Sequence, residues 1–341
     1  MTIAAVLLAY AVGVGTLGAR MLARAGWTVR APLLAILTYL AAVWSVVAAL
    51  ALVGLTLAVH ATALGGALSQ LIGACVLRLR ATYATPGGMA AAGAGLVLTG
   101  AIAVRTAVTA ARHLRLTRRQ ALRHARTARL VGRPEPALGA VLLEHSQPAA
   151  YCIAGRHPTV VLTTGALRVL APGQLEAVLA HERAHLTWRH HRLVATARIS
   201  CRALPFLPLM RDAEAQVERL VEMHADDAAT QARDPDSLAS ALVVLATPDA
   251  GASAPGLATA DAGASAPGLA TADAGASASV LASAATDAVQ RIHRLLRPAE
   301  PLGRPRRLLL RAMAAGLVLG PLIMALAPAV LALALGRVPH P

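Results

Sequence analysis

Lysine is missing from this sequence of 341 residues, and all 32 of its basic side chains are arginine. Aromatic residues make up only 2%, so the hydrophobic fraction of 56% is mainly alanine, leucine and valine. Three widely separated cysteines without a CxxC-type neighbour exclude a disulfide framework and a thiolate metal site. The mean hydropathy of +0.58 is high for a soluble protein. The composition therefore favours several membrane helices joined to one soluble domain.

Four apolar stretches are long enough to cross a membrane. They are residues 2–19, 32–59, 89–110 and 308–336. The first lacks the basic start of a cleavable signal peptide, so we expect a membrane helix there, with a signal peptide as the alternative. A weaker apolar stretch at 61–80 is interrupted by glycines and ends in arginines. We expect it to be interfacial or extracytoplasmic.

Arginines gather at corresponding ends of these stretches. They are Arg20, Arg24 and Arg30 after the first; Arg112, Arg115, Arg118, Arg119, Arg123, Arg126 and Arg129 after the third; and Arg291, Arg294, Arg297, Arg304, Arg306 and Arg307 before the fourth. The positive-inside rule then places the N-terminus outside and residues 112–307 in the cytoplasm. Their position beside the spans favours contact with the lipid bilayer over a nucleic-acid patch, so we expect no direct nucleic-acid binding.

The segment 112–307 has the pattern of an α+β domain that is mostly α. Short β-branched runs at 139–145, 149–155 and 159–164 predict a small β meander. Residues 173–199 and 210–232 predict helices, separated by a break at Pro205 and Pro208. We therefore expect a polytopic membrane protein with about four transmembrane helices and a cytoplasmic α+β domain.

A low-complexity insert interrupts this segment. The words DAGASAPGLATA occur at 249–260 and again at 261–272, and a third copy starts at Asp273. The repeat has little to bury, so we expect disorder rather than a solenoid. The predicted regions are a first helix with a basic link at 1–31, the second and third helices at 32–111, a cytoplasmic α+β domain at 112–247, the disordered insert at 248–280, a basic juxtamembrane segment at 281–307, and the fourth helix with a short tail at 308–341.

The stretch LAHERAHLTWRHH at 179–191 contains His-Glu-x-x-His. His181 and His185 are four residues apart, so on a helix both imidazoles lie on one face and can bind one ion. The adjacent Glu182 reaches the side of that ion where a water molecule would sit. This spacing is typical of a Zn²⁺ site with a general base, in which Zn²⁺ activates water and Glu182 takes its proton.

Zinc needs a third protein ligand, and VERLVEMHADDAA at 217–229 offers candidates. Glu218, Glu222 and Asp226 follow one another at steps of four and share a helical face. One of them can bind the metal, and another can hold a ligand histidine by its second nitrogen.

Other polar residues near the motif have structural interpretations. His190 and His191 are expected to continue the motif helix and to be solvated or to face the substrate, with metal binding as the alternative. His224 is expected to point away from Glu222 and Asp226, with a role as a transition-state hydrogen-bond donor as the alternative. Trp188 is expected in the core or an interface, and Thr163 and Thr164 either lie beside a bound peptide or cap a loop.

Together, VLAHERAH, EMHAD and the upstream TVVLTTGALRVLAPGQLEAVLAHE resemble the membrane-bound zinc metallopeptidases of the BlaR/MecR antirepressor type, which are related to the HtpX and Ste-type proteases. The resemblance covers roughly residues 135–235. It implies that His181, His185 and Glu222 bind one Zn²⁺, that Glu182 is the catalytic base, and that Asp226 orients a ligand histidine. Two departures are the repeat insert and a C-terminal tail too short for a sensor domain.

The resemblance implies a zinc metalloendopeptidase of the bacterial cell membrane, in which residues 112–247 form a cytoplasmic zincin-like metallopeptidase domain. Its substrate would be a protein or peptide, such as a cytoplasmic transcriptional repressor. We expect the substrate to bind in an extended form along the edge of the 159–164 strand. The alternatives are a non-cleaving signalling scaffold with a zinc-binding domain and a general quality-control protease. A transporter is disfavoured, since the spans contain almost no acid–base pairs.

Overall fold

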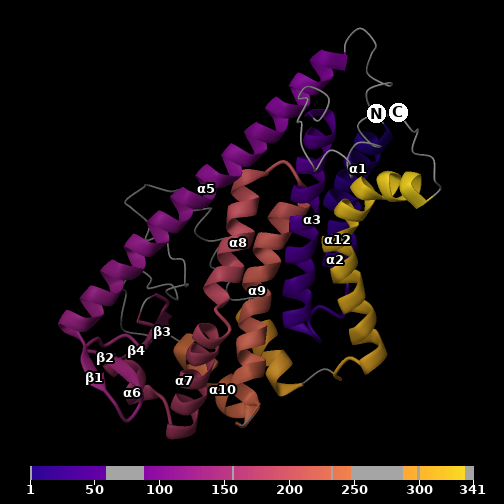
Figure 1. Cartoon of the computed structure of the whole chain (residues 1–341). Helices are drawn as coiled ribbons and strands as arrows, with labels where there is room; N and C mark the ends of the chain where they lie inside the picture. Colours follow the sequence, from indigo (N-terminus) through magenta and orange to yellow (C-terminus); the bar gives the residue numbers. More distant parts are fainter. Residues whose placement is uncertain are drawn as a thin grey trace, which may run out of the picture.

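The computed structural model describes residues 2–58, 88–155, 157–231, 233–246, 287–297 and 300–334. Within them, long helices form a bundle, and a small sheet with shorter helices lies at its lower end in Figure 1. The predicted segment at 61–80 and the repeat insert at 249–279 fall outside the described residues. The fold is therefore mostly helical with a small sheet, as predicted.

Four described helices are long and apolar enough to cross a membrane. The first is built from α1 (Thr2–Gly13), a π-helical turn η1 (Val14–Gly18) and α2 (Ala19–Ala23); the others are α3 (Pro32–Ala58), α5 (Gly88–Val131) and α12 (Arg304–Ala334). The apolar windows of α5 and α12 are only 6% buried. A soluble monomer rarely exposes so much contiguous apolar surface, which suggests a membrane protein.

Helix α3 lies at the centre of the bundle. It contacts the apolar helices α1, α5 and α12 and also α8 (His190–Ala203) and α9 (Pro208–Thr230) of the predicted peptidase segment. Its fully buried Ile36, Tyr39 and Val43 belong to one core with Leu209 and Met223 of α9. Helix α8 packs beside α9 and also contacts α3 and α5. The α8–α9 hairpin therefore packs directly on the apolar bundle. Helix α5 runs unbroken through residue 112, and the predicted division of domains at that residue stays a prediction.

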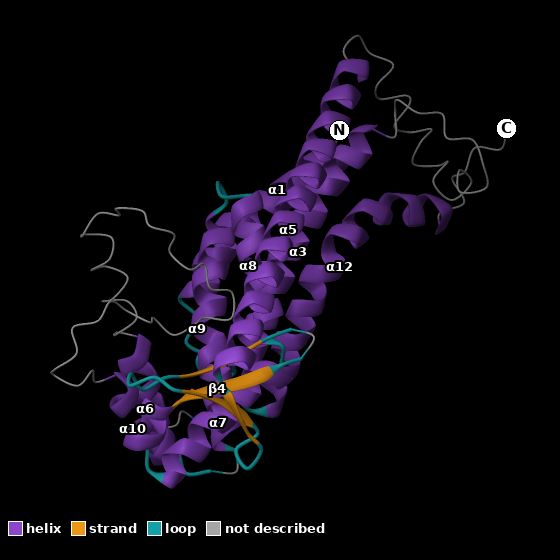
Figure 2. Cartoon of the chain, turned by 90° about the vertical axis from the view of Figure 1, so that its left-hand side faces the viewer, coloured by secondary structure: helices purple, strands orange, loops and turns teal. Residues whose placement is uncertain are grey.

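The sheet consists of β1 (Arg133–Glu135), β2 (Ala140–Leu143), β3 (Ala150–Ile153) and β4 (Thr159–Thr163). Its order is β1-β2-β4-β3, with β2 parallel to β4 and β3 antiparallel to β4. The predicted meander was therefore wrong. Strand β4 is buried along almost its whole length. It lies between β2 and β3, so both of its edges are paired. Figure 2 shows the sheet crossing the lower end of the bundle.

A short loop leads from β4 through α6 (Thr164–Val169) to the motif helix α7 (Pro172–Thr187). The Thr163 hydroxyl accepts the Ala166 N–H at the start of α6. Gly165 approaches the Ser146 backbone so closely that a Cβ would lie 2.2 Å from its carbonyl oxygen. Pro172 starts α7, where the Gln174 side chain accepts the Ala171 N–H. These contacts determine where α7 begins.

The predicted continuous helix over 173–199 is instead two helices, α7 and α8. The chain turns at Arg189, which has a φ of 52° and is the only described non-glycine residue with positive φ. A left-handed residue costs about 1–2 kcal/mol, so the packing beyond it must compensate. The turn sends His190 back toward His185 of α7.

Candidate metal centre

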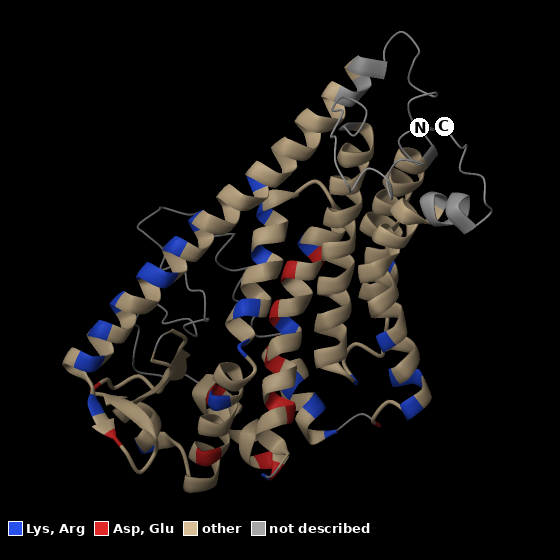
Figure 3. Ribbon diagram, in the orientation of Figure 1, with Lys and Arg blue, Asp and Glu red and all other residues tan. Residues whose placement is uncertain are grey.

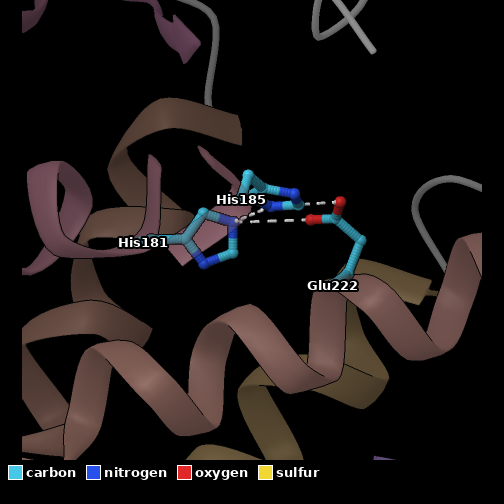
Figure 4. A group of neighbouring side chains, drawn as sticks. All are labelled: His181, His185 and Glu222. Carbon is cyan, nitrogen blue, oxygen red and sulfur yellow. Dashed lines mark hydrogen bonds and ion pairs between the residues drawn. The ribbon is translucent and has the colours of Figure 1, made fainter. Parts of the chain in front are cut away.

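Helices α7 and α9 face each other and carry the three residues drawn in Figure 4. His181 and His185 lie one turn apart on α7, and their Nε2 atoms are 3.1 Å from each other. Glu222 projects from α9 toward both rings. Its Oε2 lies 3.5 Å from His181 Nε2, and its Oε1 lies 3.5 Å from His185 Nε2.

These spacings fit a metal ion. A tetrahedral zinc ion with bonds of about 2.0–2.1 Å separates its ligand atoms by about 3.4 Å. The observed separations of 3.1–3.5 Å are close to that value. His181, His185 and Glu222 form the one group of described His, Cys, Asp and Glu residues whose ligand atoms converge in this way. Two imidazoles and a carboxylate, with a solvent-accessible side at Glu222, could hold a divalent metal with an open position.

Asp226 and Arg291 support His181 from behind. Asp226 is fully buried one turn after Glu222, and its Oδ1 lies 3.0 Å from His181 Nδ1. This contact is an ion pair when the His181 ring is protonated. Arg291 donates to both oxygens of Asp226, at 2.8 and 2.7 Å, and lies 3.0 Å from Glu222 Oε2. The contact at Nδ1 leaves His181 Nε2 for the metal.

Arg291 was predicted to lie at lipid headgroups together with Arg294, and that interpretation was wrong for both. They lie on a helical stretch at 287–296 that packs on α9. Arg294 donates to both carboxylate oxygens of Asp227, at 2.6 and 2.7 Å, and to the backbone of Val29. Carboxylates of α9 hold these two arginines in the protein, as Figure 3 illustrates by the red and blue residues around the lower part of α9.

His190 and His224 lie behind His185, as Asp226 and Arg291 lie behind His181. His190 is fully buried, and its Nδ1 lies 3.1 Å from His185 Nδ1. On the far side of its ring, His190 Nε2 lies 2.9 Å from His224 Nδ1. If His185 binds a metal through Nε2, its Nδ1–H donates to His190, and His190 donates in turn to His224. A chain of neutral imidazoles thus orients His185.

The prediction that His190 continues the motif helix as a solvated or substrate-facing residue was therefore wrong, although His190 does not belong to the group of metal-facing residues. In an unbroken helix, residues five apart point about 140° away from each other, so His190 could not face His185. The left-handed turn at Arg189 removes this restriction. An arginine in such a turn gives no local signal, and only a glycine or asparagine there would have predicted the break.

Glu182 lies beside the metal-facing imidazoles on α7. Its carboxylate is in hydrogen-bond contact with the thiol of Cys152 on β3. Burial raises the pKa of Glu182 to about 7, with further effects of His181 and Glu222. A carboxylate with a pKa near neutrality can both accept and return a proton at physiological pH. Burial also raises the pKa of the Cys152 thiol, so this cysteine stays protonated.

The charges around the two imidazoles differ. Burial opposes protonation of His181, but Asp226 and Glu222 outweigh it and raise its pKa to about 10. Burial lowers the pKa of His185 to about 4. Burial also disfavours the charged form of Asp226, but Arg291 holds its pKa at about 2. Glu222 is likewise held ionised, because His181 and Arg291 lower its pKa against the effect of burial.

The remaining candidates lie away from the metal-facing atoms. Glu218 is paired with Arg198 at 2.7 Å. Trp188 is 46% exposed and packs edge-on against His224, so it is not a core residue. Thr163 and Thr164 bond the backbone of residues 145–149, which favours the loop-capping alternative. Of the predicted carboxylates, Glu222 and Asp226 reach the motif histidines.

The comparisons with known proteins agree with this geometry. Residues 114–207 match the model of Peptidase family M48, a stretch that includes α7 and ends before Glu222. Neither the curated proteins nor the solved structures gave a significant match. The family match does not distinguish the BlaR/MecR type. The similarity covers residues 114–207 and supports, together with the site geometry, a metallopeptidase of the zincin type.

Proposed function

We propose that this protein is a membrane-bound zinc-dependent metalloendopeptidase. One observation carries the proposal: His181 Nε2, His185 Nε2 and the Glu222 carboxylate oxygens lie within 3.1–3.5 Å of one another. Glu182 lies beside this group on the same helix as the two histidines. The four apolar helices support a membrane location. The M48 match supports peptide-bond hydrolysis as the reaction.

His181, His185 and Glu222 would hold the zinc ion. When bound, zinc supplies a Lewis acid that polarises a carbonyl and makes water more acidic. Glu182 accepts the proton of the attacking water and passes it to the leaving amine. Asp226 and His190 keep the two imidazoles aimed at one point, so little reorganisation is needed during the reaction.

The substrate would bind along β3 rather than along the predicted strand at 159–164. Both edges of β4 are occupied, by β2 and β3. Among the described strands, none pairs with the second edge of β3, and Cys152 brings that strand next to Glu182. The Ala149 carbonyl accepts the Thr163 N–H, so the alternation of an antiparallel ladder turns the backbone of Ala150 and Cys152 toward the open edge. An extended peptide could add there as a further strand.

The substrate class and the orientation follow from the sequence argument. The arginine-flanked spans favour a cytoplasmic peptidase domain in a multi-pass protein of the bacterial cell membrane. A cytoplasmic repressor is then an accessible substrate, and a damaged membrane protein is the alternative. A reporter fused to the C-terminus should be found outside the cytoplasm, and a cytoplasmic reporter would reverse the orientation.

Replacement of the base tests the reaction. Glu182→Gln should keep zinc and lose cleavage of a casein-like reporter, because the amide cannot accept a proton. The matched control is Glu176→Gln on the same helix, whose side chain is 70% exposed. Equal activity in Glu182→Gln and the control would refute the role of Glu182. Zinc binding without any cleavage by the unmodified protein would favour the non-cleaving scaffold.

Replacement of the third ligand tests the metal site. Glu222→Ala should lose most of the bound zinc while the helical content survives. The control, Glu218→Gln, changes a carboxylate one turn earlier that contacts Arg198. Unchanged zinc in Glu222→Ala, measured by metal analysis, would show that this carboxylate is not a ligand.

A further inference from the structure

The turn between α8 and α9 is an apolar tip bracketed by arginines. Residues 203–210 read ALPFLPLM and lie between Arg202 and Arg211. Phe206 is the single phenylalanine of the chain and is 68% exposed. Pro205, Arg202 and Arg211 are exposed as well. We refer to residues 203–210 as the hairpin tip.

The hairpin tip reaches the level of the first apolar span. Leu207 packs on Gly15, where an added Cβ would lie 3.4 Å from Leu207 Cδ2. Gly15 belongs to the span Ile3–Ala23 and lies eight residues before its end at Ala23. At 1.5 Å per residue, the tip therefore lies about 12 Å inside that end of the span. Figure 1 shows the α8–α9 turn alongside the bundle helices rather than below them.

A second span holds the tip from the other side. Arg105 of α5 donates from Nε to the Ala203 carbonyl at 2.6 Å and from a terminal nitrogen to the Arg202 carbonyl at 3.2 Å. These carbonyls belong to the last turn of α8, where a cation is favourable. An arginine inside an apolar span needs such partners. Arg105 therefore fixes the tip at the level where the apolar part of α5 ends.

The backbone of the tip suits an apolar environment. Pro205 and Pro208 have no N–H, so two of the donors of the turn are absent. Leu204 and Met210 donate their N–H groups to carbonyls within the turn and α8, at 2.9 and 3.0 Å. Backbone groups placed at membrane depth must be satisfied in this way.

We propose that the hairpin tip is inserted into the bilayer leaflet on the side of the peptidase domain. Pro205 and Phe206 contact acyl chains, and Arg211 extends back to the lipid phosphates. The Arg202 guanidinium lies 3.2 Å from His113 Nδ1 of α5 and adds a second contact between the tip and that span. This inference rests on the membrane location in the proposed function, but not on its catalytic chemistry. It gives the α8–α9 hairpin, which carries Glu222, a fourth anchor besides α1, α3 and α5.

The insertion sets the height of the metal centre above the lipid. Fourteen residues of α9 separate Pro208 from Glu222, which corresponds to about 21 Å of helix. The tip itself lies about 12 Å inside the end of the first span, so the metal centre would lie only about 9 Å beyond that end. Because one rigid hairpin joins the tip to the site, peptide bonds close to the membrane surface would be cleaved preferentially. The substrate class would then be proteins held at the membrane surface.

Spin labels in liposomes test the insertion. Phe206→Cys and Pro205→Cys are made in the full-length protein with Cys75, Cys152 and Cys201 replaced, then labelled and reconstituted in phosphatidylcholine and phosphatidylglycerol. Collisions with oxygen, which enters the acyl region, are compared with collisions with a water-soluble nickel chelate. Glu176→Cys serves as the reference in water, and Leu319→Cys on the outward face of α12 as the reference in lipid. Zinc content verifies the fold of each variant.

At 205 and 206, the ratio of oxygen to nickel collisions should be several-fold above that at 176 and close to that at 319. A ratio equal to that at 176 would overturn the insertion. Shielding from both reagents would also overturn it, since protein rather than lipid would then cover the tip. A water-like ratio at 319 as well would instead refute the membrane location, whereas loss of peptidase activity alone would bear only on the catalytic proposal.

Discussion

The two sides of the metal centre present the same residue in opposite surroundings. His181 and His185 are one helical turn apart and face the same carboxylate. Behind His181 lie an aspartate and an arginine, whereas behind His185 lie two neutral histidines. The carboxylate side raises the pKa of His181 to about 10, and burial on the histidine side lowers that of His185 to about 4.

This difference shows that a ligand spacing does not determine a ligand's basicity. An anionic partner strengthens an imidazole as a donor and also makes it compete for protons. A neutral partner orients the ring without adding charge. The candidate site therefore combines one strongly basic imidazole with one that stays neutral throughout the physiological range.

The largest predicted effect is the pH dependence of zinc binding. Below pH 10 the metal-free site carries a proton on His181, and zinc must displace it. Displacement of this proton alone should make affinity rise by about tenfold per pH unit up to that pKa. His185, with its pKa of about 4, releases nothing in this range. Calorimetry near pH 9, above the pKa of Glu182, should find about two protons released per zinc, one from His181 and one from the zinc-bound water. Release of only one would show that His181 is not protonated, and release of three would show that His185 is protonated as well.

Removing the charge behind His181 should have the next largest effect. Asp226→Asn should weaken zinc binding by about 10–100-fold. It should also lower the free energy of unfolding, because Arg291 loses its buried partner. The control is Asp227→Asn, which changes the neighbouring carboxylate that binds Arg294. Competition with a chelator measures affinity, and equal affinities of the two variants would remove Asp226 from the site.

Removing the histidine side should have a smaller effect. His190→Leu leaves the Nδ1 of His185 without its partner, so zinc affinity should fall by about tenfold, the lower end of the range for such partners. The proton release by His181 should stay the same. His191→Leu is the control at the next position, because the contact with His185 Nδ1 comes from His190. A fall as large as that of Asp226→Asn would mean that both partners act through charge.

The smallest effect is expected at Arg189, whose turn brings His190 to His185. Arg189→Gly should change the free energy of unfolding by less than about 0.5 kcal/mol, because glycine accepts a positive φ but adds unfolded-state freedom. Arg189→Val should lower it by about 1–2 kcal/mol, since a branched side chain is strained there. Thermal denaturation distinguishes the two, and equal stabilities would show that the turn is not strained.

Much of this site could be predicted because helical periodicity is a local property. The spacing of four predicted that His181 and His185 share a face, as do Glu222 and Asp226, and the structure has both pairs on single helices. The apolar runs predicted the long helices for a similar reason, since length and composition suffice. Glu218 has the same spacing but is paired with Arg198, so periodicity alone could not select among the carboxylates.

The sequence by itself determined which side chains lie on one helix face and which stretches are apolar enough to cross a membrane. Only the tertiary structure decided that Arg291, 65 residues beyond Asp226, completes the carboxylate side. It also decided that the turn at Arg189 brings His190 to His185, and that β3 rather than β4 has the open edge. These three features depend on contacts between distant segments. Their energy comes from packing and charge pairing across the fold, and local sequence carries no record of it.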